Sequence, residues 1–133
     1  MIYNSGFQGT DAGIILINTN NGEIINNDIS ENWFGITLWN SDGNIVNHNN
    51  LNENFMSIII RESNENIGIE NIFSDNQVGI TIVGPSSDNL IYLNSFYRSK
   101  FCHVAYLSYS GSGNSWDNGS VGNYWRNAHV NGD

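Results

Sequence analysis

The segment NSDGNIVNHNNLNEN, residues 40–54, holds seven asparagines in fifteen positions, yet it spaces Val46 and Leu51 as residues of a core. The whole chain of 133 residues contains 25 Asn and 18 Ile but a single Pro. Asparagine and glycine favour turns and left-handed backbone, whereas isoleucine favours strands. This composition predicts an all-β protein with many tight corners.

An internal repeat of 22 residues organises the chain, and such a period is typical of solenoids. One column of equivalent positions contains Gly13, Gly35, Ser57 and Gly79, and the next contains Ile14, Ile36, Ile58 and Ile80. One extra residue near Pro85 continues the register through two more columns: Ile24, Val46, Gly68 and Ile91, then Ile29, Leu51, Phe73 and Phe96. Apolar residues alternate in runs such as GIILIN and GITLWN, which is the periodicity of strands.

A 22-residue unit of short strands cannot bury its apolar face alone, so successive units must stack. The sequence therefore predicts a right-handed parallel β-helix of about five coils, each of about 22 residues. We assign the repeats to residues 1–109 and a C-terminal aromatic cap to residues 110–133, where Trp116, Tyr124 and Trp125 are suited to cover the last coil.

Ten of the 25 asparagines fall into three columns of this repeat. Asn27, Asn49, Asn71 and Asn94 share one column, Asn44, Asn66 and Asn89 a second, and Asn32, Asn54 and Asn76 a third. Because a side-chain amide both donates and accepts hydrogen bonds, stacked copies can bond to each other and to backbone groups at a corner. We therefore expect these asparagines to be structural, together with a hydroxyl column of Thr19, Ser41, Ser63 and Ser86.

The repeats NIVNHNNLNENFMSIII and GEIINNDISENWFGITL resemble those of NosD-like right-handed β-helix proteins of bacteria and archaea. The tail NSWDNGSVGNYW, residues 114–125, resembles the closing segment of archaeal members and is the more specific signal. The resemblance implies an exported protein, in the periplasm, secreted or at the cell surface. Similar repeats also occur in pectate-lyase-like enzymes, polysaccharide epimerases and phage tailspikes.

The charge balance bears on the partners that this chain can have. Its net charge is −9, from 4 basic and 13 acidic residues. Nucleic-acid binding needs clustered Lys and Arg, so we expect no nucleic-acid partner.

No apolar run reaches the roughly 20 residues that span a bilayer. The start MIYNSGFQGTDAG lacks the features of a signal peptide, so we expect a piece of a longer exported protein.

One acidic column is a candidate site for chemistry. Glu31, Glu53 and Asp75 are 22 residues apart and are followed in register by Arg98. Stacked carboxylates raise one another's pKa or recruit a cation, so this column is a candidate for calcium binding or for catalysis on a polysaccharide. The alternative that we favour is a solvated corner whose side chains splay apart.

The NosD resemblance raises the question of copper, which prefers imidazole and sulfur ligands. The available groups are His48, His103, His129, Cys102, Met1 and Met56. Cys102 and His103 are neighbours on a strand and should point to opposite faces. His48 falls in a column between Asn26 and Glu70, which favours an ordinary surface His–Glu pair. We therefore predict no copper centre.

Outward apolar residues form the strongest candidate binding surface. The predicted binding residues are Ile15, Ile17, Trp39, Ile59 and Tyr92. Such outward apolar residues form a contiguous strip, and a strip of this kind usually marks an interface. We therefore expect self-association or binding of another protein. Stacking of a sugar ring on Trp39 is the alternative.

These features favour a non-catalytic secreted or cell-surface β-helix module with a structural or binding role. The alternatives are a polysaccharide lyase, hydrolase or epimerase that uses Glu31, Glu53 and Asp75, or a carbohydrate-binding β-helix. Fold alone does not decide between them.

Overall fold

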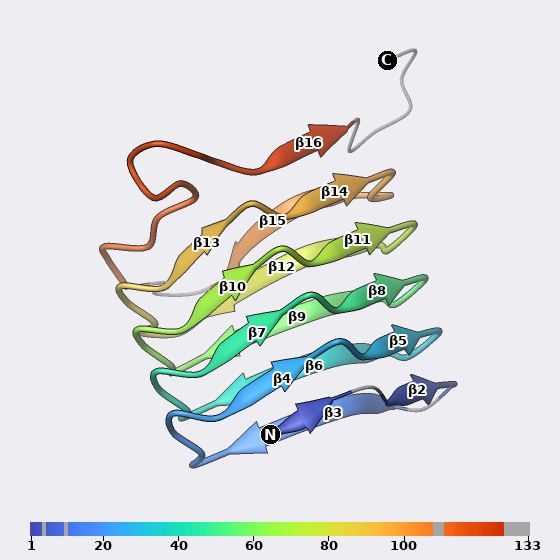
Figure 1. Ribbon diagram of the computed structural model, residues 1–133, viewed down its shortest axis with the longest axis horizontal. Helices are drawn as coiled ribbons and strands as arrows, with labels where there is room; N and C mark the ends of the chain where they lie inside the picture. Colours follow the sequence, from blue (N-terminus) through green and yellow to red (C-terminus); the bar gives the residue numbers. More distant parts are fainter. Residues whose placement is uncertain (4, 10, 108–110, 127–133) are drawn as a thin grey trace.

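A computed structural model of the protein describes residues 1–3, 5–9, 11–107 and 111–126. Within these residues the chain forms strands and no helix, and each coil contains three strands. The strands of each coil lie above those of the coil before, so that three parallel sheets run along the axis (Figure 1). The predicted parallel β-helix is thus confirmed.

Sheet A contains β1 (Ile2–Tyr3), β4 (Glu23–Ile25), β7 (Ile45–Asn47), β10 (Ile67–Ile69) and β13 (Leu90–Tyr92). Sheet B contains β2 (Gly6–Gln8), β5 (Asp28–Ser30), β8 (Asn50–Asn52), β11 (Ile72–Ser74), β14 (Ser95–Tyr97) and β16 (Tyr124–Arg126). Sheet C contains the longer strands β3 (Ala12–Ile17), β6 (Phe34–Trp39), β9 (Met56–Arg61), β12 (Val78–Val83) and β15 (Cys102–Leu107).

The register between coils follows the repeat in the sequence. Ile36 lies beside Ile14 on one side and Ile58 on the other, each 22 residues away. Beyond the insertion near Pro85 the step becomes 23 in sheet A, as in the pairing of Ile67 with Leu90, and 24 in sheet C, as in the pairing of Val78 with Cys102. In Figure 1 the chain rises from the N-terminus at the bottom, with the strands of sheets A and B in front running to the right and those of sheet C behind running to the left. A chain that rises in this way forms a right-handed helix.

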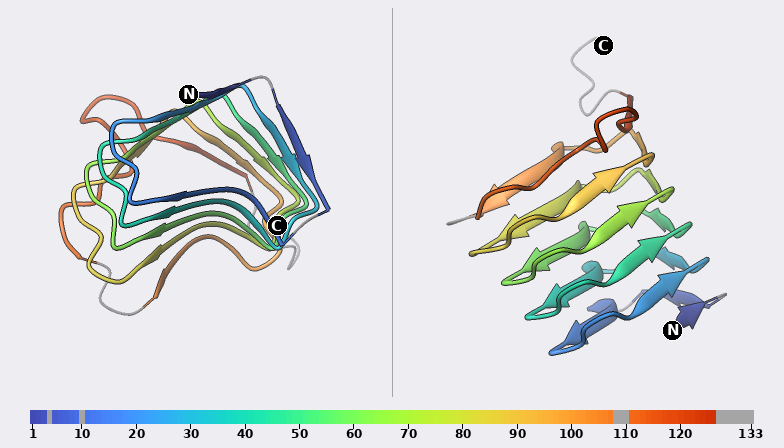
Figure 2. Two further views of the ribbon diagram at one scale, coloured as in Figure 1. Left: turned by 90° about the horizontal axis from the view of Figure 1, so that it is seen from below. Right: turned by 60° about the vertical axis from the view of Figure 1, so that its left-hand side comes forward.

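Seen from below, the coils lie over one another around a common axis (Figure 2). The core is a column of apolar side chains inside these coils. The three-residue strands of sheets A and B, such as β4, β5, β7 and β8, alternate, so that the middle residue faces this column and its two neighbours face outward. Fully buried members come from all three sheets and include Ile24, Ile29, Ile36, Leu38, Leu51, Phe73, Ile80, Ile91 and Phe96. The predicted core columns are therefore confirmed for these residues.

The predicted asparagine columns are continuous hydrogen-bonded ladders. Along one corner, Asn27, Asn49 and Asn71 each donate a side-chain amide hydrogen bond to Oδ1 of the asparagine in the following coil, at 2.9 to 3.0 Å. The same Oδ1 atoms also accept backbone N–H groups, at 2.8 to 2.9 Å. The amides thus satisfy the polar groups that a buried corner leaves without strand partners.

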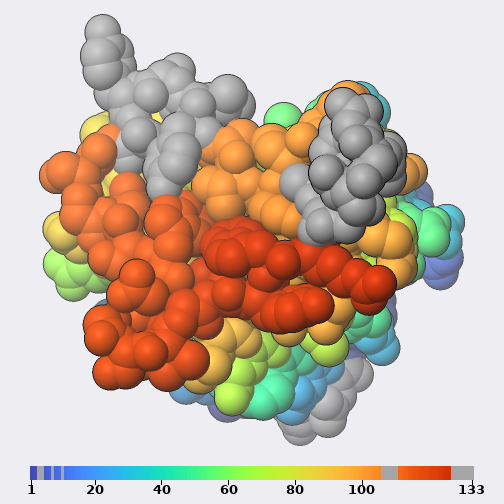
Figure 3. Space-filling view, turned by 90° about the horizontal axis from the view of Figure 1, so that it is seen from above, coloured from blue at the N-terminus to red at the C-terminus, as the bar shows by residue number. Residues whose placement is uncertain are grey.

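The C-terminal segment lies across the top of the last coil (Figure 3). Strand β16 pairs in parallel with β14, and the Trp125 ring stacks on Phe96 with 4.5 Å between ring centroids. Asn114 and Asn123 extend two of the ladders by accepting from Asn89 and Asn94. Residues 110 and 127–133 of the predicted cap lie outside the described residues, so the proposed boundary at 109/110 stays a prediction.

Candidate functional site

The outward side of sheet C is an apolar surface, which we call the sheet C face. It contains Ile15, Ile17, Phe34, Thr37, Trp39, Met56, Ile59, Arg61, Val78, Thr81 and Val83. Among these, Ile15 and Ile17 are half exposed, whereas Ile59, Val78 and Thr81 are 9%, 8% and 0% exposed. Arg61 is the one charged residue of the set.

A hollow of about 250 Å³ opens on this face. It is lined by Ile15, Ile17, Phe34, Thr37, Trp39, Ile59 and Arg61. The structure thus brings together four of the predicted binding residues, Ile15, Ile17, Trp39 and Ile59. The fifth, Tyr92, lies on β13 in sheet A, away from this group.

Sequence reasoning missed Phe34 as a lining residue. Simple alternation places Phe34 on the same side as the buried Ile36, but the pairing of β6 with its neighbours skips Gly35. A side chain at Gly35 would meet the backbone oxygen of Ser57 at 2.4 Å, so the coils approach closely at this irregularity. The glycine column at 13, 35 and 79 was the available signal for it.

Trp39 does not offer both faces of its ring to a ligand. The guanidinium of Arg61 lies 4.6 Å from the centre of the indole, in a cation–π contact. On the other side Trp39 pairs in register with Ile17. A sugar ring would therefore have to displace Arg61 before it could stack on this indole.

The acidic column occupies a corner where the backbone is left-handed. Glu31, Glu53 and Asp75 have φ values of 58°, 55° and 56°, and Arg98 follows with 50°. Each backbone N–H donates to a carbonyl of the following coil, as from Glu53 to Ser74 at 3.0 Å. The position is thus set by the turn of the coil, which explains why its side chains point to solvent.

Two of the three acids have partners outside the column of carboxylates. Gln8 donates to Glu31 at 2.8 Å, and Arg98 binds Asp75 through two hydrogen bonds of 2.7 and 2.6 Å. The hydrogen bond from Arg98 holds the pKa of Asp75 below its usual value. Within the described ranges, no three His, Cys, Asp or Glu side chains are grouped closely enough to hold a metal ion. Calcium binding and catalysis by this column stay predictions.

The candidate copper ligands lie apart from one another. His48 pairs with Glu70 at 3.1 Å, which confirms the predicted surface pair. Cys102 pairs in register with Val78, in the outward column of Met56, and burial raises the pKa of its thiol. His129 lies outside the described residues.

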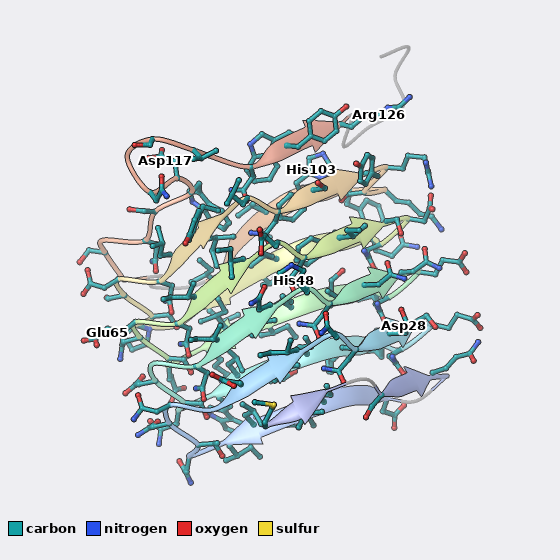
Figure 4. The ribbon with its side chains drawn as sticks, viewed as in Figure 1. Asp28, His48, Glu65, His103, Asp117 and Arg126 are labelled. Carbon is teal, nitrogen blue, oxygen red and sulfur yellow. The ribbon has the colours of Figure 1, made fainter. Side chains whose placement is uncertain are left out.

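His103 lies beneath the cap (Figure 4). Its ring is 5.5 Å from that of Phe96 and 5.6 Å from that of Trp125. Nδ1 makes a 2.8 Å hydrogen bond with the Ser99 hydroxyl, whereas Nε2 is buried without a hydrogen-bond partner in the part of the chain that the structure describes. Burial lowers the pKa of this imidazole, and the Arg126 backbone opposes part of the shift.

The stacked coils, the ladders and the cap define a parallel β-helix repeat protein. A family model described as "Periplasmic copper-binding protein (NosD)" matches residues 1–129, so the chain belongs to the NosD family. No curated protein and no solved structure gives a significant match. In the described residues no helix is long and apolar enough to cross a membrane.

The description of the family raises the question of copper again, and the described residues do not fit that ion. Copper sites combine several imidazole or sulfur ligands at one point. Here the His48 imidazole pairs with the Glu70 carboxylate, and the His103 ring lies between the rings of Phe96 and Trp125. Within residues 1–3, 5–9, 11–107 and 111–126 the structure groups no three His, Cys, Asp or Glu side chains at one point.

Proposed function

We propose that this chain is a non-catalytic β-helix module of the periplasm or cell surface that binds a second copy of itself through the sheet C face. The family's periplasmic description supports the location. The observation that carries the binding role is the sheet C face itself, an apolar surface with a hollow and a single charge. The largest contiguous apolar patch on a protein surface is often a functional one.

The distribution of charge favours a second copy as the partner. The chain carries a net charge of −9, but its acidic residues lie outside the sheet C face. Two copies can therefore meet through this face without opposing their acidic corners. The four strands that form this face are spaced by about 4.8 Å and are about 20 Å long, which gives at most roughly 400 Å² per partner, the size of a weak or transient interface. We expect a weak dimer at micromolar concentration.

Light scattering after size-exclusion chromatography tests this proposal. The unmodified protein should be dimeric at high concentration, and Ile17→Glu should make it monomeric. The matched control is Ile72→Glu on the outer side of sheet B, because Ile72 and Ile17 are 48% and 51% exposed. A monomer in the unmodified protein, or equal dissociation by both variants, would contradict the proposal.

A further inference from the structure

The hollow on the sheet C face combines apolar side chains with one charged side chain. Five of its lining residues are apolar, and the charged one, Arg61, lies over Trp39. We propose that this hollow binds a small apolar anion, a molecule with a ring or a short alkyl body and one carboxylate or sulfonate. This proposal shares the sheet C face with the proposed function but does not depend on dimerisation.

Arg61 is arranged to receive the anion. Its guanidinium carbon lies 4.6 Å from the centre of the Trp39 indole, and an arginine in such a contact can still donate N–H hydrogen bonds to an anion. Within the described residues its one ion-pair partner is Glu62, which contacts Nε at 3.5 Å, the long limit of a hydrogen bond. The two terminal nitrogens can therefore bind a carboxylate or sulfonate.

The apolar part of the ligand fits the rest of the hollow. Ile15, Phe34 and Ile59 line it, and they leave an apolar surface of the kind that excludes water from a ligand. The volume of about 250 Å³ is slightly below the range of about 300 to 1,000 Å³ that holds drug-sized ligands. The ligand's body should accordingly be one or two rings, or an alkyl chain of similar size.

Other classes of small ligand fit this hollow less well. A cation would meet Arg61 without a carboxylate in the lining. A neutral sugar would meet an aliphatic surface and an indole whose face is already covered by Arg61. The nearest acid is Glu62, which competes with an anionic ligand for the same guanidinium.

Two fluorescent probes of similar shape test the proposal. Anilinonaphthalene sulfonate carries the anion, and N-phenyl-1-naphthylamine is its neutral counterpart. Titrations should be run at a protein concentration at which light scattering finds a monomer. Arg61→Gln should weaken binding of the sulfonate by roughly tenfold, as expected for a charge-assisted hydrogen bond, and should leave the neutral probe unchanged. Glu62→Gln should strengthen binding of the sulfonate because it removes the competing carboxylate.

The hollow itself is tested by Ile15→Glu, which should abolish binding of both probes, with Ile72→Glu as the matched control that binds both normally. The proposal is overturned if the unmodified protein binds no sulfonate probe, if Arg61→Gln affects both probes equally, or if Ile72→Glu abolishes binding as Ile15→Glu does. A monomeric protein with this probe profile would support the site while contradicting the proposed dimer. A dimeric protein that lacks this probe profile would support the proposed dimer and contradict the site.

Discussion

At the scale of single residues, Asn71 shows how a ladder asparagine uses both the oxygen and the nitrogen of its side-chain amide. Oδ1 of Asn71 accepts from the backbone N and the Nδ2 of Asn49, at 2.9 and 3.0 Å. Its Nδ2 donates to the Val46 carbonyl at 2.8 Å and to Asn94 at 2.9 Å. Asn71 is 1% exposed, so no water can replace these bonds without opening the coil.

We expect Asn71→Ala to lower the free energy of unfolding by about 3 kcal/mol, because it leaves several buried groups without partners. Asn50→Ala is the control, since Asn50 is exposed and donates one bond of 3.2 Å to Asp28. Its effect should stay within about 0.5 kcal/mol. Denaturant unfolding measures both, and equal midpoints for the two variants would refute the structural role of the ladder.

A buried hydroxyl gives a prediction of the opposite sign. Thr81 is 0% exposed, and its Oγ1 has no hydrogen-bond partner in the described part of the chain. Thr81→Val keeps the branched shape and removes the unpaired hydroxyl, so it should stabilise the protein by about 1 kcal/mol. Thr19→Val should instead destabilise it, because that hydroxyl donates to the Ile17 carbonyl at 3.0 Å. Thermal melting compares the two, and a lower melting temperature for Thr81→Val would count against the burial argument.

The same residues show what the sequence could predict. Asn27, Asn49 and Asn71 were predictable because a constant period brings identical positions into one column. Asn114 and Asn123 were not, because they join the ladders from a segment that lies 25 and 29 residues after their partners. The hollow was predicted only in part, since the place of Phe34 depends on the irregularity at Gly35.

At the scale of elements, the junction between β14, β15 and β16 should respond to pH. Burial holds the pKa of His103 below its value in the unfolded chain, about 6.5. The folded state thus favours neutral imidazole, and its contribution to stability is complete above that value. As pH falls through 6.5 and then through the lower folded pKa, the unfolded state binds the proton first and this stability is lost.

We therefore expect the unfolding free energy to fall more between pH 7.5 and pH 5 in the unmodified protein than in His103→Gln. His48→Gln is the control, because His48 is exposed on the surface beside Glu70. It should retain the pH dependence of the unmodified protein. If His103→Gln retained the full dependence as well, another group would be responsible.

The acidic corner gives a prediction about calcium. Arg98 occupies Asp75 through two hydrogen bonds, and this pairing leaves the column without three free carboxylates. We expect millimolar calcium to leave the melting temperature of the unmodified protein nearly unchanged. Arg98→Gln frees Asp75 about 4.8 Å from its neighbour along the axis, so this variant should gain a calcium-dependent rise. Adding Glu53→Gln should abolish that rise, and a calcium response already present without Arg98→Gln would restore the predicted calcium site.

At the scale of the whole molecule, a solenoid is held together by contacts between neighbouring coils, so its stability need not be uniform along the axis. The interior aromatic stack illustrates this local coupling. Phe73 stacks on Phe96 at 4.4 Å, and Phe96 stacks on Trp125 of the cap at 4.5 Å. Each ring thus contacts, and directly stabilises, the coil next to its own.

Removal of the cap contact should consequently loosen the molecule from the top downward. We expect Trp125→Ala to increase hydrogen exchange first in β14, then in β11, and to leave β5 and β8 nearly unchanged. Trp33→Ala is the matched control, because Trp33 is 55% exposed and stacks on Phe55 at a corner far from the cap. It should not alter exchange in β14. Mass spectrometry of peptides from each coil gives this profile, and an equal increase in all coils would mean that the solenoid unfolds as one cooperative unit.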